Sequence, residues 1–182
     1  MPPRRKRLQR FEIPGAPRYL TFSCHGRLPL LGSAALRDAF AAHLESIHAR
    51  GAFRLFAWVI MPEHVHLVLV PSHPEWPVPA ILRTIKRPFA RRVIRRWREL
   101  NAPVLERLVD ASGGNRFWLR GGGYDSNIES PDLLSVVIKY THLNPERRGL
   151  VLDPRDWRWS SARWYEGSRR ELVTIDPIDD YV

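Results

Sequence analysis

The stretch that decides the fold is Ile60–Val70, with the sequence IMPEHVHLVLV. Valine and leucine dominate it after Pro62, which is typical of a buried β-strand. Side chains alternate between the two faces of a strand, so His64 and His66 point one way while Val65 points the other. Two imidazoles on one face are close enough to bind one divalent metal ion. The pair alone is also compatible with two structural histidines that are hydrogen-bonded to backbone or water.

The segment 130–145 has the features of a helix that ends near Asn144. Its first residues, Ser130 and Pro131, suit the N-cap and the first helical position. The proline after Asn144 disfavours helical geometry there. Tyr140 and Asn144 are four residues apart and therefore share one side of the last turn. A phenol beside a metal can be a nucleophile, and an amide oxygen can be a third ligand. An amphipathic core tyrosine and an ordinary helix-end asparagine are the alternatives.

An ordered set of motifs resembles the single-tyrosine HUH transposases, and within them the REP-associated tyrosine transposases. The run Met61–Leu67 is similar to their His-hydrophobic-His motif, and Tyr140–Val151, YTHLNPERRGLV, is similar to their tyrosine segment. The resemblance spans about residues 18–165 in the right order. Further similar segments are Phe22–Arg27, Phe117–Arg120 and Asp156–Ala162.

The resemblance implies an activity on single-stranded DNA. His64 and His66 would bind Mg or Mn, and Asn144 occupies the position of a third, helix-borne metal ligand. The best-known members of the wider group have Gln at that position, while Asn occurs there among REP-associated members. Tyr140 would attack a backbone phosphorus, leaving a 5′-phosphotyrosine link and a free 3′ hydroxyl. The wider family implies a homodimer, although REP-associated members can be monomers.

The order of the expected elements predicts an α+β, ferredoxin-like fold, as the resemblance also implies. An order of β-α-β-β-α-β gives an antiparallel sheet with helices on one face, and the tyrosine-bearing helix follows it. Pro88 should kink or divide the second helix. The expected strands are 19–24, 53–61, 64–70 and 124–128, and the expected helices are 33–50, 80–100 and 130–144. We expect a basic flexible arm over 1–17, a catalytic domain over 18–165 and a tail over 166–182.

Charge and composition point to a polyanionic partner. The 182-residue chain has a net charge of +10 and an isoelectric point near 10.7. The basic run Arg4–Arg7 could be a phosphate-binding arm or a solubilising tail. A single cysteine, Cys24, excludes an internal disulfide and favours a reducing, cytoplasmic compartment. We expect no membrane partner, because the apolar runs are far too short to span a bilayer.

The second helical region predicts a DNA-binding surface, because its cations crowd the side that the apolar stripe leaves free. Arg120 precedes a glycine run and could approach a phosphate. Trp157, Trp159 and Trp164 could either stack on splayed bases or anchor a terminal segment. The crowded cations are Arg83, Lys86, Arg87, Arg91, Arg92, Arg95, Arg96 and Arg98.

Three functions fit these patterns. The first is a metal-dependent single-strand DNA endonuclease and strand transferase that acts in transposition or on repeated palindromes, with single-stranded or hairpin DNA as partner. The second is a domesticated DNA-binding protein without cleavage activity, and the third is an RNA-binding ferredoxin-like domain. An intact His64, His66 and Tyr140 favour the first. Glu63 is expected to face away from the histidine pair, and His48 to lie on the surface.

Overall fold

The fold is that of a computed structural model of the chain, which describes residues 13–73, 76–110, 112–121, 123–168, 170–178 and 181. The basic run Arg4–Arg7, expected to be either a phosphate-binding arm or a solubilising tail, lies outside the described residues, as does most of the expected arm over 1–17. The three expected domain boundaries stay predictions.

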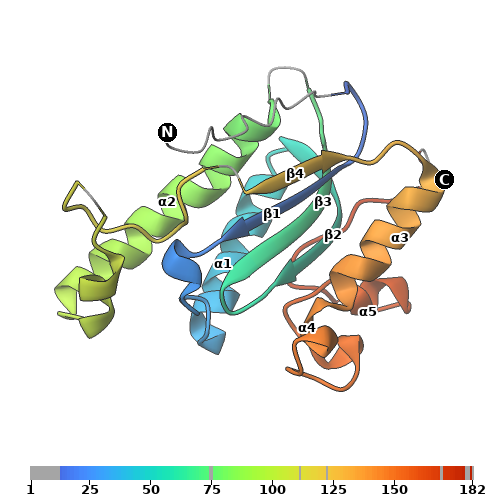
Figure 1. Cartoon of the computed structure of the whole chain (residues 1–182). Helices are drawn as coiled ribbons and strands as arrows, with labels where there is room; N and C mark the ends of the chain where they lie inside the picture. Colours follow the sequence, from blue (N-terminus) through green and yellow to red (C-terminus); the bar gives the residue numbers. More distant parts are fainter. Residues whose placement is uncertain are drawn as a thin grey trace, which may run out of the picture.

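A four-stranded antiparallel sheet forms the centre of the molecule (Figure 1). Its strands are β1 (Arg18–Ser23), β2 (Phe53–Ile60), β3 (His64–Pro71) and β4 (Tyr124–Asn127). They lie in the spatial order β2-β3-β1-β4, and every neighbouring pair is antiparallel. Together with the chain order of strands and helices, this arrangement confirms the predicted α+β, ferredoxin-like fold.

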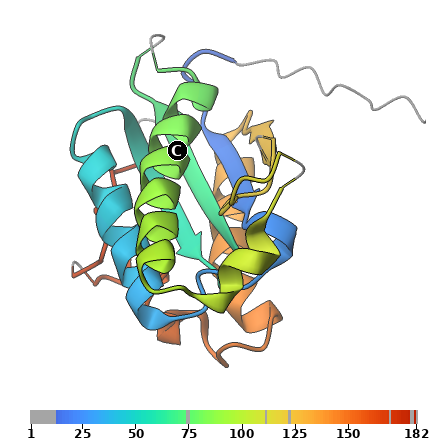
Figure 2. The ribbon, with the colours of Figure 1, turned by 90° about the vertical axis from the view of Figure 1, so that its left-hand side faces the viewer.

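The helices divide between the two faces of the sheet. Helices α1 (Ala34–His48) and α2 (Val78–Glu99) lie side by side over one face (Figure 2). Helix α3 (Pro131–His142) covers the other face, where its buried Leu134 and Ile138 pack on the sheet. None of the helices in the described part of the chain has the length and apolar character needed to cross a bilayer.

Alternation along β1 and β3 decides which side chains meet which helix. Leu20 and Phe22 of β1 belong to the large core beneath α1 and α2, as do Val65 and Leu67 of β3. The residues between them therefore face α3. In the β1–β3 ladder Thr21 lies opposite His66, which places polar groups of both strands on this second face.

Pro88 does not divide the second helix, in contrast to one of the two sequence expectations for it. Helix α2 runs from Val78 to Glu99 with Pro88 inside it. The proline is exposed, so its ring meets solvent, while Ile85 and Phe89 beside it are fully buried in the core. Burial of these neighbours offsets the loss of one backbone hydrogen bond.

The C-terminal segment is part of the packed structure. Val173 and Ile175 are buried in the core. The Asp176 amide donates to the Leu55 carbonyl at 2.9 Å, and the Asp176 carboxylate accepts from the Leu55 amide at 2.6 Å. The same carboxylate lies 2.7 Å from Nε2 of His48, so His48 is buried and the expectation of a surface position is wrong.

Two tryptophans that precede this segment have packing partners. Trp157 is buried, and its Nε1 donates to the Ile60 carbonyl at 3.1 Å. Nε1 of Trp159 donates to the Asp38 carboxylate at 2.8 Å, and the guanidinium carbon of Arg37 lies 3.8 Å from its ring centroid. These contacts support the anchoring interpretation over base stacking. The remaining short helical turns are η1 (His25–Arg27), η2 (Pro103–Leu108), α4 (Asn144–Arg147), η3 (Pro154–Asp156) and α5 (Ala162–Tyr165).

Candidate functional site

A cavity of about 780 Å³ lies between the sheet and α3. All four residues that the sequence assigned to cleavage and metal binding line its wall. His64 and His66 come from β3, Tyr140 from the last turn of α3, and Asn144 from the start of α4. The structure thus brings together side chains that are up to 80 positions apart in sequence. Their chemical roles stay predictions. We call this space the catalytic cavity, after the roles that the sequence predicts for these four residues.

The two imidazoles face each other through their Nε2 atoms, which are 2.8 Å apart. Nδ1 of His64 lies 3.2 Å from the Glu63 carboxylate. A carboxylate only accepts, so this Nδ1 donates and Nε2 carries the lone pair. Nδ1 of His66 lies 2.6 Å from the Tyr19 hydroxyl and 2.8 Å from the Thr21 hydroxyl. A hydroxyl can donate or accept, so Nδ1 of His66 is satisfied in either tautomer. Because His64 carries its lone pair at Nε2, the 2.8 Å contact requires the Nε2–H of His66 to donate. Presenting a lone pair at Nε2 to a metal ion would move this proton to Nδ1, where either hydroxyl can accept it.

Burial keeps these groups uncharged. It lowers the pKa of His66 to about 3, with a further lowering by His64 and an opposing hydrogen bond that His66 donates to Asn144. Burial also lowers the pKa of His64, although the Glu63 carboxylate opposes the shift. The pKa of Tyr19 is raised to about 12, again mainly by burial. Near pH 7 both imidazoles are therefore neutral, which is the form that binds a metal ion.

Glu63 lies in the site, so the expectation that it faces away from the histidines is wrong. Alternation does not extend to Glu63 because β3 begins only at His64. The turn before β3 is held in place by a hydrogen bond that the Cys24 amide donates to the Glu63 carbonyl at 2.8 Å. The carboxylate of Glu63 also binds the guanidinium of Arg148 at 2.8 Å. An acid directly before the histidine pair was the available sequence signal, because ligating histidines are commonly oriented by a carboxylate.

Asn144 is oriented by the end of α3. Its Nδ2 donates to the carbonyls of Tyr140 and Thr141, at 2.9 and 3.1 Å. Both amide hydrogens are thereby used, and the side-chain oxygen is left for the hydrogen bond with His66. Within the described residues, no three or more His, Cys, Asp and Glu side chains form a metal-binding group. A third protein ligand would therefore be of another type, and the Asn144 oxygen fits that role for Mg or Mn.

Tyr140 is the exposed member of the set, with 41% of its surface accessible. Its ring lies 6.2 Å from the ring of Tyr19 at an interplanar angle of 83°. The guanidinium carbon of Arg147 lies 4.9 Å from its centroid. Helix α3 is fixed at its C-terminal end, two residues beyond Tyr140, where Nε2 of His142 is hydrogen-bonded to the Ser161 hydroxyl at 2.8 Å. The phenol is thus accessible to a ligand while its helix is anchored.

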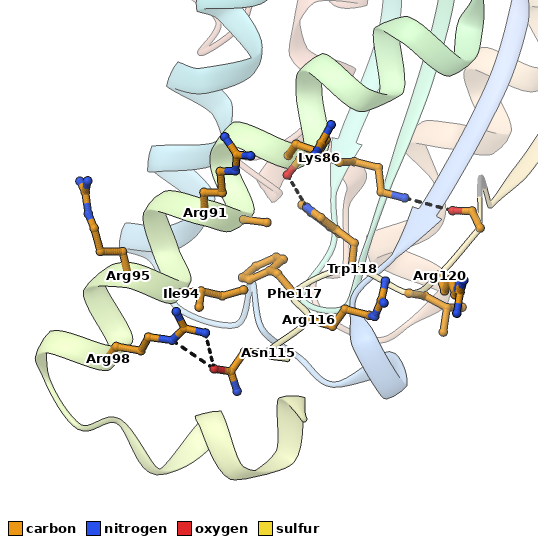
Figure 3. Close-up of a pocket in the computed structure, with 14 residues that line it drawn as sticks. Lys86, Arg91, Ile94, Arg95, Arg98, Asn115, Arg116, Phe117, Trp118 and Arg120 are labelled. Atoms are coloured by element: carbon orange, nitrogen blue, oxygen red, sulfur yellow. Dashed lines mark hydrogen bonds between the residues drawn. The ribbon is translucent and has the colours of Figure 1, made fainter. Parts of the chain in front are cut away.

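A second cavity of about 500 Å³ lies between α2 and the segment 115–121 (Figure 3). Its floor includes Ile94 and Phe117. The Trp118 indole donates to the Lys86 carbonyl at 3.0 Å, which ties the segment to the helix. Seven cations line this space, which we call the basic groove: Lys86, Arg87, Arg91, Arg95, Arg98, Arg116 and Arg120.

The basic groove contains only some of the cations that the sequence assigned to DNA. Arg83, Arg92 and Arg96 are exposed on α2 but do not line it. Arg116 lines the groove although the sequence did not single it out. Its position depends on how an irregular segment packs against α2, and it is ion-paired with Asp110 at 2.5 Å. Helical periodicity gives no signal for such a residue.

Comparison with known proteins gives a family match over more than half of the chain. The family model described as "Transposase IS200 like" matches residues 19–127. This region includes the histidine pair and the basic groove, and it ends before Tyr140. No curated protein sequence matches the chain.

Two solved structures are similar to the chain to different degrees. One is described as a REP-associated tyrosine transposase bound to a REP hairpin, with a TM-score of 0.66, 17% identity, and coverage of 95% of this chain and 93% of the other. Another, a candidate transposase from Deinococcus radiodurans, has a TM-score of 0.48 at 19% identity, covering 73% of this chain and 95% of its own. At these identities the likeness shows the fold alone, and the second carries no weight. By the family match, this chain belongs to the IS200-like transposases.

Proposed function

We propose that this protein is a metal-dependent single-strand DNA endonuclease and strand transferase, acting in transposition or on repeated palindromic elements. The observation that carries the proposal is the convergence of His64, His66 and Tyr140 on one cavity wall. The alternative is a domesticated DNA-binding protein of the same fold that does not cut. Such a protein has no need for an exposed phenol near two neutral imidazoles whose Nδ1 atoms are held by hydrogen bonds.

His64 and His66 would hold Mg or Mn through their Nε2 atoms, with the Asn144 oxygen as third protein ligand. When bound, the ion supplies positive charge that polarises the scissile phosphate and stabilises the charge that develops there. The hydroxyls of Tyr19 and Thr21 and the carboxylate of Glu63 fix the orientation of the two rings.

Tyr140 would be the nucleophile. Its oxygen forms a bond to phosphorus while the bond from phosphorus to the 3′ oxygen breaks. The phenol gives up its proton, and the 3′ oxygen leaves as a hydroxyl, so the 5′ phosphate stays on the tyrosine. The phosphodiester energy is kept in the new bond, and rejoining by a 3′ hydroxyl needs no ATP.

The basic groove would bind the DNA backbone through its cations. The fold neighbour is bound to a REP hairpin, which supports hairpin DNA as the partner here. The groove and the catalytic cavity are neighbours along the chain, because Arg120 and Gly121 line the first and Tyr124 lines the second. Because α2 and α3 cover opposite faces of the sheet, a strand bound in the groove would pass around the edge strand β4 to reach Tyr140.

The proposal is tested by incubating the protein with Mn²⁺ and labelled single-stranded hairpins from beside its own gene. A denaturation-resistant protein–DNA adduct is expected. Tyr140→Phe removes only the hydroxyl, so it should abolish the adduct while leaving DNA affinity nearly unchanged. The matched control is Tyr181→Phe, which removes a phenol that does not line the cavity and should leave the adduct intact. An adduct with Tyr140→Phe, or undiminished cutting in excess EDTA, would refute the assignment.

A further inference from the structure

One part of the catalytic cavity is lined by apolar side chains that neither the histidine pair nor the nucleophile uses. Tyr124 of β4 and Leu133 and Val137 of α3 form this part of the wall. Tyr124 is 60% exposed and Leu133 is 42% exposed. Large apolar groups that stay accessible inside a cavity are typical of a ligand-binding surface.

Tyr124 and Tyr140 both lie next to the ring of Tyr19. Tyr124 lies opposite Thr21 in the ladder between β1 and β4, so its side chain is on the face of the sheet that carries Tyr19 and His66. Its ring is 5.9 Å from the ring of Tyr19, and the ring of Tyr140 is 6.2 Å from it. The exposed ring of Tyr124 therefore lies within a short reach of the proposed nucleophile.

The backbone of Tyr124 is held firmly although its side chain is exposed. The preceding residue, Gly123, has a φ of +77°, and a Cβ there would lie 1.8 Å from the Thr21 carbonyl oxygen, so only glycine fits this close approach. On the other face of β4, Nε of Arg18 donates to the Asp125 carboxylate at 2.9 Å, and both side chains are almost fully buried. The point from which the exposed ring projects is therefore fixed relative to the sheet.

We propose that Tyr124 is a stacking platform for an unpaired DNA base that adjoins the attacked phosphate. Leu133 and Val137 of α3 contact the same base, and Ser126, two residues along the strand face, offers a hydroxyl to its polar edge. The inference rests on the proposed function, because that function places the scissile phosphate between the histidine pair and Tyr140.

The choice of a base as occupant follows from continuity with the phosphate site and from charge. A base has an apolar face that stacks on an aromatic ring, and its sugar joins it directly to the neighbouring phosphate. Arg27, Arg148 and Glu63 line the same cavity, and because Glu63 is paired with Arg148 the balance stays positive, which favours a polyanionic strand. Because every base has a flat face, the platform recognises an unpaired position rather than a sequence.

The test measures binding rather than cleavage. Fluorescence anisotropy in EDTA would measure the binding of the Tyr140→Phe protein to labelled hairpins with single-stranded flanks. In a series of these hairpins, each flanking base in turn is replaced by an abasic site. Adding Tyr124→Ala should weaken binding about tenfold, the range expected for one stacked base. An abasic site at one position should weaken hairpin binding by the Tyr140→Phe protein to a similar extent. The same abasic site should cause no further loss of affinity when Tyr124 is also replaced by alanine.

Conservative variants separate stacking from folding. Tyr124→Phe keeps the ring and should bind within twofold of its parent, whereas Tyr124→Leu should lose affinity as alanine does. The matched control is Val136→Ala, an exposed apolar residue of α3 that does not line the cavity, which should bind normally. The platform would be overturned if Tyr124→Ala left the affinity for hairpin DNA unchanged. It would also be overturned if the loss from Tyr124→Ala added to the loss from the abasic site at every position. If the coupling is found but no adduct forms in the cleavage assay, Tyr124 still stacks on an unpaired base and the proposed cleavage function fails.

Discussion

The catalytic cavity and the basic groove are both polar, but their side chains are held in different ways. In the cavity, each imidazole is fixed at its outer nitrogen, and Asn144 is fixed by two helix carbonyls. In the groove, Arg87, Arg91 and Arg95 are exposed and lie one turn apart along α2. Chemistry depends on groups held within a fraction of an ångström, whereas phosphate binding depends mainly on charge density. The two regions should therefore respond to mutation in different ways.

The largest effect is expected from removing one imidazole. His66→Ala should lower the rate of adduct formation on the order of a thousandfold, because a metal ion contributes several kcal/mol to such a reaction. Affinity for hairpin DNA in EDTA should fall far less, since the groove is untouched. Single-turnover rates and anisotropy measure the two quantities. Equal losses of rate and affinity would show that the two regions are not separate in function.

A pH effect should follow from the anchor of α3. Burial lowers the pKa of His142 to about 4 from the ordinary value of 6.5. The folded state keeps the imidazole neutral, whereas the unfolded state takes up a proton below pH 6.5. The free energy of unfolding is therefore unaffected by this group above pH 6.5, and it falls as the pH drops from 6.5 towards 4. The loss should reach about 3 kcal/mol at the acid end. Urea unfolding at pH 7 and pH 4.5 measures it. In His142→Gln the free energy of unfolding should change less between the two pH values, because the contribution of His142 is gone. An unchanged pH dependence would contradict the assignment.

A smaller effect is expected from the carboxylate that orients His64. Glu63→Ala should weaken Mn²⁺ binding about tenfold to a hundredfold, as is usual when an outer partner of a metal-binding histidine is lost. Glu63→Gln should lie in between, because an amide oxygen still accepts from Nδ1. Titration calorimetry with Mn²⁺ and no DNA measures the affinity directly. Native Mn²⁺ affinity in Glu63→Ala would show that the contact of 3.2 Å has no such role.

The smallest effect per residue is expected in the groove. Arg91→Ala with Arg95→Ala should weaken hairpin binding several-fold, alike for all sequences. The salt dependence of binding should fall by about one unit for each phosphate that the protein no longer neutralises. Arg83→Ala with Arg96→Ala removes the same charge from α2 outside the groove. Equal effects of the two pairs would show that the charge of the helix matters and the groove does not.

The sequence predicted those parts of the site that follow from a regular period. The two-residue period of a strand placed His64 and His66 on one face, and the helical period placed Tyr140 and Asn144 on one side of a turn. The element order then predicted the sheet and its helices. Each of these inferences uses only neighbours within one element, or the short connections between elements.

The remaining parts depend on contacts that no period describes. Glu63 enters the site because the strand begins one residue later, where the Met61 amide donates to the His64 carbonyl at 2.8 Å. Arg116 enters the groove through an irregular segment. Val173 and Ile175 fill the core from a short apolar stretch, LVTI over 172–175, that belongs to no helix or strand. Such positions are set by tertiary packing, which sequence spacing alone does not specify.

The presence of one phenol from α3 beside one histidine pair in a single copy of the chain has a stoichiometric consequence for strand exchange. With Tyr140 as nucleophile, each molecule can hold only one cut end by a covalent bond at any moment. The other end, with its free 3′ hydroxyl, must be retained by reversible contacts until it re-attacks. Any reaction that needs two covalently held ends at once would require two molecules, whereas opening and resealing one hairpin junction needs one.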